Sequence, residues 1–202
     1  MNASPQNPIF GHRFFGGLEA DARRHVNPDG SMGAIVAVSA TIADGLTLLA
    51  SIEIGPFASI GPHASIGHGV SIGADTSIGH GVSIGADTSI GHGVSIGNGA
   101  SIGADTSIGH GVSISYGDWF ISCGPQGSRN AMLTAVQTVG GLRWWVGCKH
   151  NITTEALRGM VEKTHGGTDH EADYHHVIAF VENHPARIRC ERLRAEKTEV
   201  VQ

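Results

Sequence analysis

The residues best suited to chemistry in this sequence lie in a turn-rich loop at positions 124–130. Its glycines let several backbone N–H groups converge, Ser128 adds a hydroxyl, and Arg129 adds a planar cation. This combination suits a phosphate or a carboxylate, because a guanidinium makes paired, charge-assisted hydrogen bonds to either group. No Gly-Lys-Ser/Thr follows, so the loop is not a P-loop. We predict that Gly127, Ser128, Arg129 and Asn130 bind a small anion, and the alternative is a hairpin turn with a solvated or structural Arg129.

Two adjacent tryptophans follow this loop, at positions 144 and 145. On a regular strand they point to opposite faces, so one is expected in the core and the other is available to stack a base or line an interface. We assign Trp144 to the predicted ligand site.

Other reactive side chains give weaker patterns. Cys148 stands at a predicted strand end before a helix, where a thiolate is stabilised, but the sequence places no third group beside it and a buried structural cysteine is favoured. The histidine-rich stretch from position 165 to 184 lacks the His-Glu-x-x-His spacing of a zinc site. We therefore predict no catalytic residues, no bound metal and no cofactor.

A six-residue repeat must position these candidates. Ser-Ile-Gly recurs almost without interruption from Ser59 to Ser115, with a small or β-branched residue two places before each Ile. Positions two apart in a strand share a face, so each Ile and this partner point one way and the intervening Ser points the other way. Three residues after the Ile comes Gly, Asp or His, types that tolerate a positive φ at a corner. The repeat predicts a solenoid of short strands around a column of isoleucines.

The same period extends backwards through Ile54, Leu48, Ile42 and Val36, giving fourteen hexads from Val36 to Ile114. This region, with the spelling Ile54-Gly55-Pro56-Phe57-Ala58, resembles the hexapeptide-repeat, left-handed parallel β-helix family. The resemblance implies three hexads per triangular coil, hence four to five coils, and a left-handed winding. It also implies a homotrimer, since the serine-rich outward faces are flat and made of small side chains.

The resemblance raises the question of acyltransferase activity, which several features of the sequence oppose. Enzymes of the family interrupt the coils with a loop, whereas here the hexads run on without insertion. His68, His80 and His92 are twelve residues apart, so with eighteen residues per coil they fall on three different corners. Only His92 and His110 are expected to stack, and a catalytic zinc needs three protein ligands. We interpret the corner histidines as structural.

The sequence predicts a mainly β chain in four parts. Residues 1–33 form an irregular N-terminal cap that plugs the open solenoid end, with a binding arm of Arg13, Arg23, Arg24 and His25 as the alternative. Residues 34–117 form the β-helix. Residues 118–185 form a small α+β domain, a three-stranded meander with two helices, the second opened by a capping box of Thr168 and Glu171. Residues 186–202 form a charged, loosely held tail.

Charge and cysteine usage exclude several classes of partner. The formal charge is −5, and no Lys or Arg occurs between Ser59 and Tyr116, so the solenoid is a poor nucleic-acid binder. No leader-like or membrane-spanning apolar run occurs, and three cysteines without close pairing favour a reducing compartment. We expect a cytoplasmic protein without nucleic-acid or membrane partners.

Two functions remain. The first is a non-enzymatic module, a trimeric β-helix whose C-terminal domains bind, and in one version sequester, a small anionic, nucleotide-like ligand. The second is an acyltransferase that uses acyl-coenzyme A between neighbouring subunits. The uninterrupted coils and the scattered histidines favour the first.

Overall fold

The computed structural model describes residues 7–115, 117–126, 131–138, 140–146 and 149–199. The chain divides into two compact units, residues 1–107 and 108–202. The boundary falls within the repeat, between Ser107 and Ile108 of one strand, so only the last Ser-Ile strand, Ser113–Ile114, lies wholly in the second unit. The repeat region is a parallel β-solenoid of about four turns, which confirms the predicted fold class.

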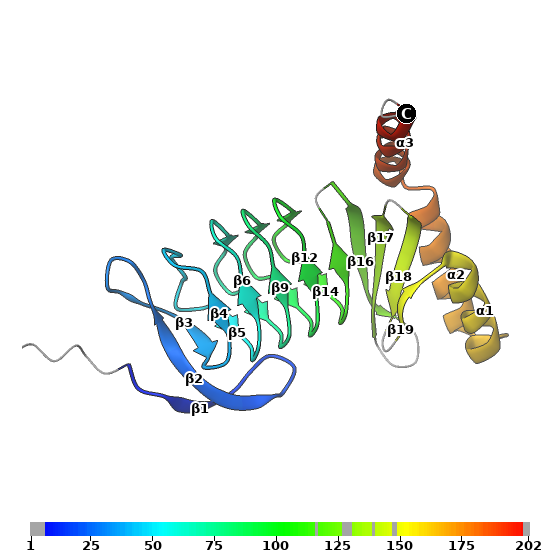
Figure 1. Cartoon of the computed structure of the whole chain (residues 1–202). Coiled ribbons are helices and arrows are strands. Elements are labelled where there is room, and N and C mark those ends of the chain that lie inside the picture. The colour runs from blue at the N-terminus through cyan, green and yellow to red at the C-terminus, as the bar shows by residue number, and fades with distance from the viewer. Residues whose placement is uncertain (1–6, 116, 127–130, 139, 147–148, 200–202) are drawn as a thin grey trace, which may run out of the picture. The chain divides into compact units, whose positions relative to one another are not determined.

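The first unit opens with three longer strands, β1 (Phe10–Arg13), β2 (Glu19–Val26) and β3 (Met32–Ala37). Two-residue strands then recur at almost every hexad (Figure 1). They are β4 (Thr41–Ile42), β5 (Glu53–Ile54), β6 (Ser59–Ile60), β7 (Ser65–Ile66), β8 (Ser71–Ile72), β9 (Ser77–Ile78), β10 (Ser83–Ile84), β11 (Ser89–Ile90), β12 (Ser95–Ile96), β13 (Ser101–Ile102), β14 (Ser107–Ile108) and β15 (Ser113–Ile114).

The strand register fixes one coil at three hexads. Ile54 pairs in parallel with Ile72, and Ile72 with Ile90, so equivalent residues stand one coil apart. Within the first unit, β3, β5, β8 and β11 form one side of the prism, β7, β10 and β13 a second, and β4, β6, β9 and β12 the third. Each isoleucine of these strands from Ile54 to Ile102 is buried, as the six-residue pattern predicts.

The corners use the residue types that the repeat supplies. Three residues after each Ile, the backbone is left-handed, with φ of +56° at Asp75, +55° at Asp87 and +65° at Gly81. Phe57 holds the same conformation, with φ of +58°, although a bulky side chain disfavours it. Thr76 and Thr88, the buried partners of Ile78 and Ile90, donate their hydroxyls to Gly91 and Gly103 carbonyls at 3.1 Å, which satisfies two polar groups inside the solenoid.

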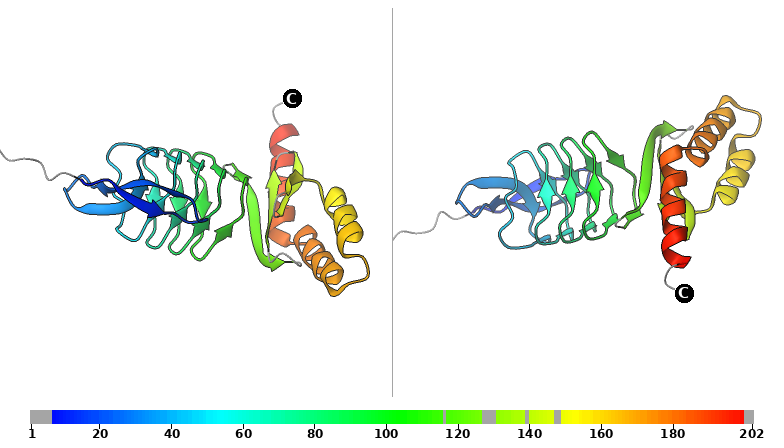
Figure 2. Two further views of the ribbon diagram at one scale, coloured as in Figure 1. Left: turned by 90° about the horizontal axis from the view of Figure 1, so that it is seen from below. Right: turned by 90° about the horizontal axis from the view of Figure 1, so that it is seen from above.

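Two regular strands lie within residues 7–33, which corrects the prediction of an irregular cap for this part of the chain. β1 and β2 form an antiparallel hairpin, and β2 pairs antiparallel with β3. The hairpin lies along one face of the stacked coils in both views of Figure 2. His12 contacts Glu53 at 2.7 Å, and the backbone of Gly16, at the hairpin tip, packs against the ring of His92. The alternation of polar and apolar residues from Glu19 to Ala22 was the available signal for a strand.

The second unit contains an antiparallel sheet in the order β16 (Trp119–Gln126), β17 (Ala131–Thr138), β18 (Gly141–Val146) and β19 (Lys149–Ile152). Its helices are α1 (Thr154–His165), α2 (Asp169–Glu182) and α3 (Pro185–Glu199). One face of the sheet packs against α1 and α2. The core of this contact contains Leu133, Ala135, Trp144, Leu157, Val161, Tyr174, Ile178 and Val181.

In the second unit, the structure adds one strand and one helix to the predicted set. The Lys149–Ile152 segment pairs with β18, so the meander has four strands instead of three. The stretch predicted as a loosely held tail forms α3 from Pro185 to Glu199. Arg187 holds it by donating to the Glu182 carbonyl at 2.8 Å and to Gln137 Oε1 at 2.7 Å, contacts that no local pattern announces.

The predicted capping box of α2 is also different. Thr168 makes no side-chain cap and instead donates its hydroxyl to the His165 carbonyl at 2.6 Å. Glu171 reaches back as predicted, but its carboxylate accepts from the N–H of Gly167. Both side chains therefore bind the backbone of the short link between α1 and α2, and they do not form the reciprocal pair of a capping box. None of the helices in the described part of the chain is both long and apolar enough to cross a membrane.

Candidate functional site

A cavity with both charged and apolar walls lies at the first coil of the solenoid. It has a volume of about 420 Å³, within the range of small-molecule sites. Each side of the first coil contributes one apolar residue to it, namely Val36, Ile42 and Leu46. These are positions that a preceding coil would cover, but Val36 and Leu46 are already buried and only Ile42 is partly exposed.

Side chains of the N-terminal segment bind the backbone of the first coil beside this cavity. Arg24 donates to the carbonyl of Ala50 at 3.0 Å, and the His25 ring nitrogen lies 3.0 Å from the carbonyl of Leu46. Asn27 accepts from the N–H of Leu48 at 2.8 Å and donates to its carbonyl at 3.2 Å. The three side chains satisfy an edge that has no preceding coil to pair with.

Arg23 lies on the cavity side of the same strand. It stands opposite Val36 in the antiparallel pair of β2 and β3, and directly opposed residues share a face. Val36 points inward, so Arg23 extends from the inner face of the sheet above the first coil. Within the described part of the chain its guanidinium has no hydrogen bond or ion pair. Asp44 and the side chain of Asn7 also line the cavity.

The side-chain amide of Asn7 has a hydrogen-bond partner for its nitrogen but none among the described residues for its oxygen. Its nitrogen donates to the carbonyl of Arg24, while its buried Oδ1 accepts no hydrogen bond from any described residue. A buried acceptor without a donor costs about 1–3 kcal/mol, and because this oxygen is enclosed, a molecule in the cavity does not reach it.

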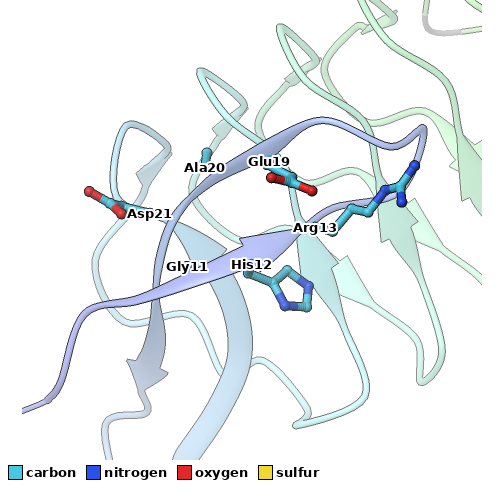
Figure 3. A pocket seen from close by; sticks show the side chains of 6 residues that line it. All are labelled: Gly11, His12, Arg13, Glu19, Ala20 and Asp21. Carbon is cyan, nitrogen blue, oxygen red and sulfur yellow. The ribbon is translucent and has the colours of Figure 1, made fainter.

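A second hollow lies on the hairpin itself and is a poorer candidate. It is lined by Gly11, His12, Arg13, Glu19, Ala20 and Asp21. Figure 3 shows Arg13 and Asp21 at opposite ends of the hairpin, so its charges do not converge on one point. The His12 ring is already engaged by Glu53 at 2.7 Å.

The corner histidines take part in bonds between coils. Nδ1 of His92 accepts from the N–H of Ala74 at 2.8 Å, which leaves the ring proton on Nε2. Asn98 makes the equivalent contact on another side of the prism, where its Oδ1 accepts a hydrogen bond from the N–H of His80 at 2.8 Å. His92 and Asn98 hold equivalent hexad positions, so the imidazole acts as a backbone acceptor. Its one lone pair is not available for base catalysis.

His68 differs from the other corner histidines. Its Nδ1 lies 3.5 Å from Oδ1 of Asp87, and both side chains are more than half exposed. A histidine beside a carboxylate is an arrangement that supports proton transfer, although exposure to water weakens the interaction. No group of three metal-ligating side chains occurs among the described residues.

Of the residues predicted to bind an anion, only Trp144 lies among the described residues. Gly127, Ser128, Arg129 and Asn130 lie outside the described residues, as does Cys148. Trp144 is fully buried, and its indole N–H donates to Thr154 Oγ1 at 2.9 Å. Trp145 is also buried, on the other face of β18, where its N–H donates to the carbonyl of Gly111 at 2.8 Å. Both tryptophans are thus core residues, and neither presents a ring for stacking a ligand.

The described cysteines offer little reactivity. Burial raises the pKa of the Cys123 thiol, which keeps it protonated and poorly nucleophilic at neutral pH. Sγ of Cys190 lies 3.3 Å from the carbonyl of Gly117.

Comparison with known proteins bears on the solenoid. Residues 51–86 match the family described as bacterial transferase hexapeptide (six repeats). This match and the β-solenoid fit the hexapeptide-repeat β-helix family. No curated protein matches the chain.

One similar solved structure is a mutant of perosamine N-acetyltransferase from Caulobacter crescentus in complex with CoA and GDP-perosamine. The identity is 28%, the match covers 40% of this chain and the TM-score is 0.39. The match spans 38% of that enzyme's chain, well under half of its length.

Proposed function

We propose that this protein is a non-enzymatic binding module, in which a hexapeptide β-helix assembles as a homotrimer and presents its C-terminal units to a small anionic, nucleotide-like ligand. The observation that carries the proposal is the use of the corner side chains. Ser39, Ser51, His92 and Asn98 each accept a hydrogen bond from a backbone N–H one coil away. Corner side chains that bind the backbone of a neighbouring coil stabilise the solenoid, and few of them remain for catalysis.

The flat faces support the trimer. Serine is the outward residue in every two-residue strand from β6 to β13, so the prism offers sides without bulky or charged groups. Small side chains permit close approach of flat surfaces related by a threefold axis.

Acyl transfer is the second candidate, and one observation favours it. The matched family is described as that of bacterial transferases, and His68 with Asp87 is the pair of side chains in the solenoid best arranged for a general base. The pair is exposed and no insertion in residues 36–114 builds a wall around it, so we rank this candidate second.

The trimer and the absence of turnover are tested together. Light scattering on the purified protein should give three times the chain mass at micromolar concentration. Incubation with acetyl-coenzyme A and amine or hydroxyl acceptors should release no free thiol above background. A monomer would contradict the assembly, and thiol release that disappears in His68→Asn but not in His80→Asn would establish the acyltransferase instead.

The predicted anion site is tested at Arg129. Calorimetry against nucleotides, coenzyme A and simple phosphates should show binding that Arg129→Ala weakens by roughly 2–4 kcal/mol, because a charge-assisted pair is lost. Arg129→Lys should also bind more weakly, since an ammonium cannot make the two-pronged contact. Equal affinity in all three proteins, with unchanged melting, would show that residues 124–130 form only a turn.

A further inference from the structure

One corner histidine has no backbone N–H to bind. The side chain of His92 accepts a hydrogen bond from the N–H of Ala74, the residue eighteen positions earlier. For His80 the residue eighteen positions earlier is Pro62, and proline has no N–H. The imidazole of His80 therefore cannot make the contact between coils that the imidazole of His92 makes.

The backbone register around His80 matches the register at the other corner. The N–H of Gly81 donates to the carbonyl of Pro62 at 2.9 Å, and the N–H of Gly93 donates to the carbonyl of Ala74 at 2.8 Å. The coils thus stack in the same way at both corners, and the proline removes only the partner of the side chain. Among the described residues, the ring of His80 has no hydrogen bond and no ion pair.

The ring of His80 lies instead beside a second exposed imidazole. His63 follows Pro62 at the corner of the preceding coil, with φ of +59°, and the two ring centres lie 5.1 Å apart. Both histidines are exposed, and the ring of His63 also lacks a hydrogen bond or ion pair within the described part of the chain. Two imidazoles that share one tetrahedral ion, at about 2.0–2.1 Å per Zn–N bond, place their ring centres about 5 Å apart. The pair is therefore spaced as two ligands of one ion.

We infer that His63 and His80 together bind a first-row divalent metal ion, Zn²⁺ or Cu²⁺, with water in the remaining positions. Neutral imidazole suits these ions, whereas Mg²⁺ prefers oxygen ligands. No Lys or Arg occurs between Ser59 and Tyr116, so no cation of this stretch repels the ion. A catalytic zinc has three protein ligands, so two histidines make a binding site and not a hydrolytic centre. The inference goes beyond the proposed function, since it requires neither the trimer nor the loop at residues 124–130.

The pair departs from the sequence prediction of no bound metal, because spacing alone does not bring these two histidines together. His63 stands three residues after an Ile and His80 two residues after one, and they are seventeen residues apart. Only the stacking of one coil on the next places their rings side by side.

NMR of the full-length protein, labelled with ¹⁵N in the histidine rings, locates the ion. Zinc chloride should shift the ring signals of His63 and His80. It should leave those of His92 unchanged, because Nδ1 of that ring already accepts the N–H of Ala74. Magnesium chloride should shift none of them. Calorimetry with zinc chloride then gives the affinity.

Matched histidine variants identify the ligands. His80→Asn should weaken Zn²⁺ binding by about tenfold or more, because even a change in an outer-shell partner of a metal site costs that much. Asparagine holds the equivalent position at Asn98, so the melting temperature should not change. His63→Asn should have the same effect, since Asn tolerates the left-handed corner. His176→Asn, which changes an exposed histidine of α2, should bind as the wild type does.

Pro62→Ala tests the reason for which His80 is free. The substitution restores an N–H at position 62, so the His80 ring can accept it as the His92 ring accepts the N–H of Ala74. Zn²⁺ binding should then weaken by up to about tenfold, the worth of one hydrogen bond, although both histidines remain.

Four results would overturn the inference. They are unshifted ring signals of His63 and His80 in excess Zn²⁺, equal affinity in the wild type and His80→Asn, an equal loss in His176→Asn, and unchanged affinity in Pro62→Ala. None of them bears on the trimer or on Arg129, so this inference and the proposed function fail separately.

Discussion

Single side chains replace missing strands at the start of the solenoid. Asn27 is 7% exposed and makes the two bonds to Leu48 that a neighbouring backbone would make, one to its N–H and one to its carbonyl. An amide side chain carries a donor and an acceptor side by side, as a peptide does, so it can end a ladder without leaving buried groups unpaired.

Asn27→Ala should therefore destabilise the first unit by about 2–4 kcal/mol, because two buried backbone groups lose their partners. Asn27→Asp should restore little, since a carboxylate can accept from the Leu48 N–H but cannot donate to its carbonyl. Denaturant unfolding followed by circular dichroism measures both. Ser51→Ala is the matched control: it removes one bond to the exposed N–H of Gly69, which water can replace, and should cost less than about 1 kcal/mol. Equal losses in Asn27→Ala and Ser51→Ala would refute this role of Asn27.

Local hydrogen bonds also make the stability of one turn depend on pH. Hydrogen bonds from the Ser31 side chain and then from its N–H lower the pKa of Asp29. The stabilisation is present above the unfolded-state pKa and is lost as the pH falls through the lower folded-state value. Because Asp29 is exposed, this effect is confined to the turn between β2 and β3.

At the scale of the element, the coil is the unit that can be gained or lost. Residues eighteen apart stack, so His110 follows His92 in the same column, and Ile96 follows Ile78. Each coil is stabilised by its own core and by contact with its neighbours, as in other solenoids.

Deleting residues 77–94, one coil, should leave a folded protein with a lower melting temperature. The deletion brings His110 to the place of His92, where it can accept from the N–H of Ala74 and lie beneath Gly16. Deleting residues 77–91 removes a length that is not a multiple of six, so downstream isoleucines leave the core column and the solenoid should unfold. Circular dichroism melting compares the two, and similar melting would refute register as the determinant of the fold.

For the whole molecule, the division into two compact units predicts unfolding in more than one step. All three tryptophans, Trp119, Trp144 and Trp145, belong to the second unit, and the first contains none. Tryptophan fluorescence therefore reports the second unit alone, whereas circular dichroism reports both.

We expect the fluorescence and circular dichroism transitions to differ in midpoint. Trp144→Phe removes the bond to Thr154 and part of the buried volume, and should lower the fluorescence midpoint by an amount equivalent to about 1–3 kcal/mol. Asn27→Ala should move only the other transition. Coincident transitions that both variants shift together would show a single cooperative unit.

The sequence by itself determined the solenoid, because its information is local and repeated. Each hexad carries its own inward Ile, outward Ser and corner residue, so register, burial and the positive φ at Asp75 or Gly81 follow from spacing alone. The stacking of His92 one coil from Ala74 followed in the same way once the coil length was known.

Only the tertiary structure decided the parts that depend on contacts between distant residues. The hairpin of β1 and β2 and the bonds from Asn27 to Leu48 join residues far apart in sequence, which no short pattern records. The same reason applies to α3, whose charged sequence suggested a free tail until Arg187 was seen to contact Gln137. It applies as well to the start of the solenoid, where Arg24, His25 and Asn27 bind the backbone of the first coil because no preceding coil is there to pair with it.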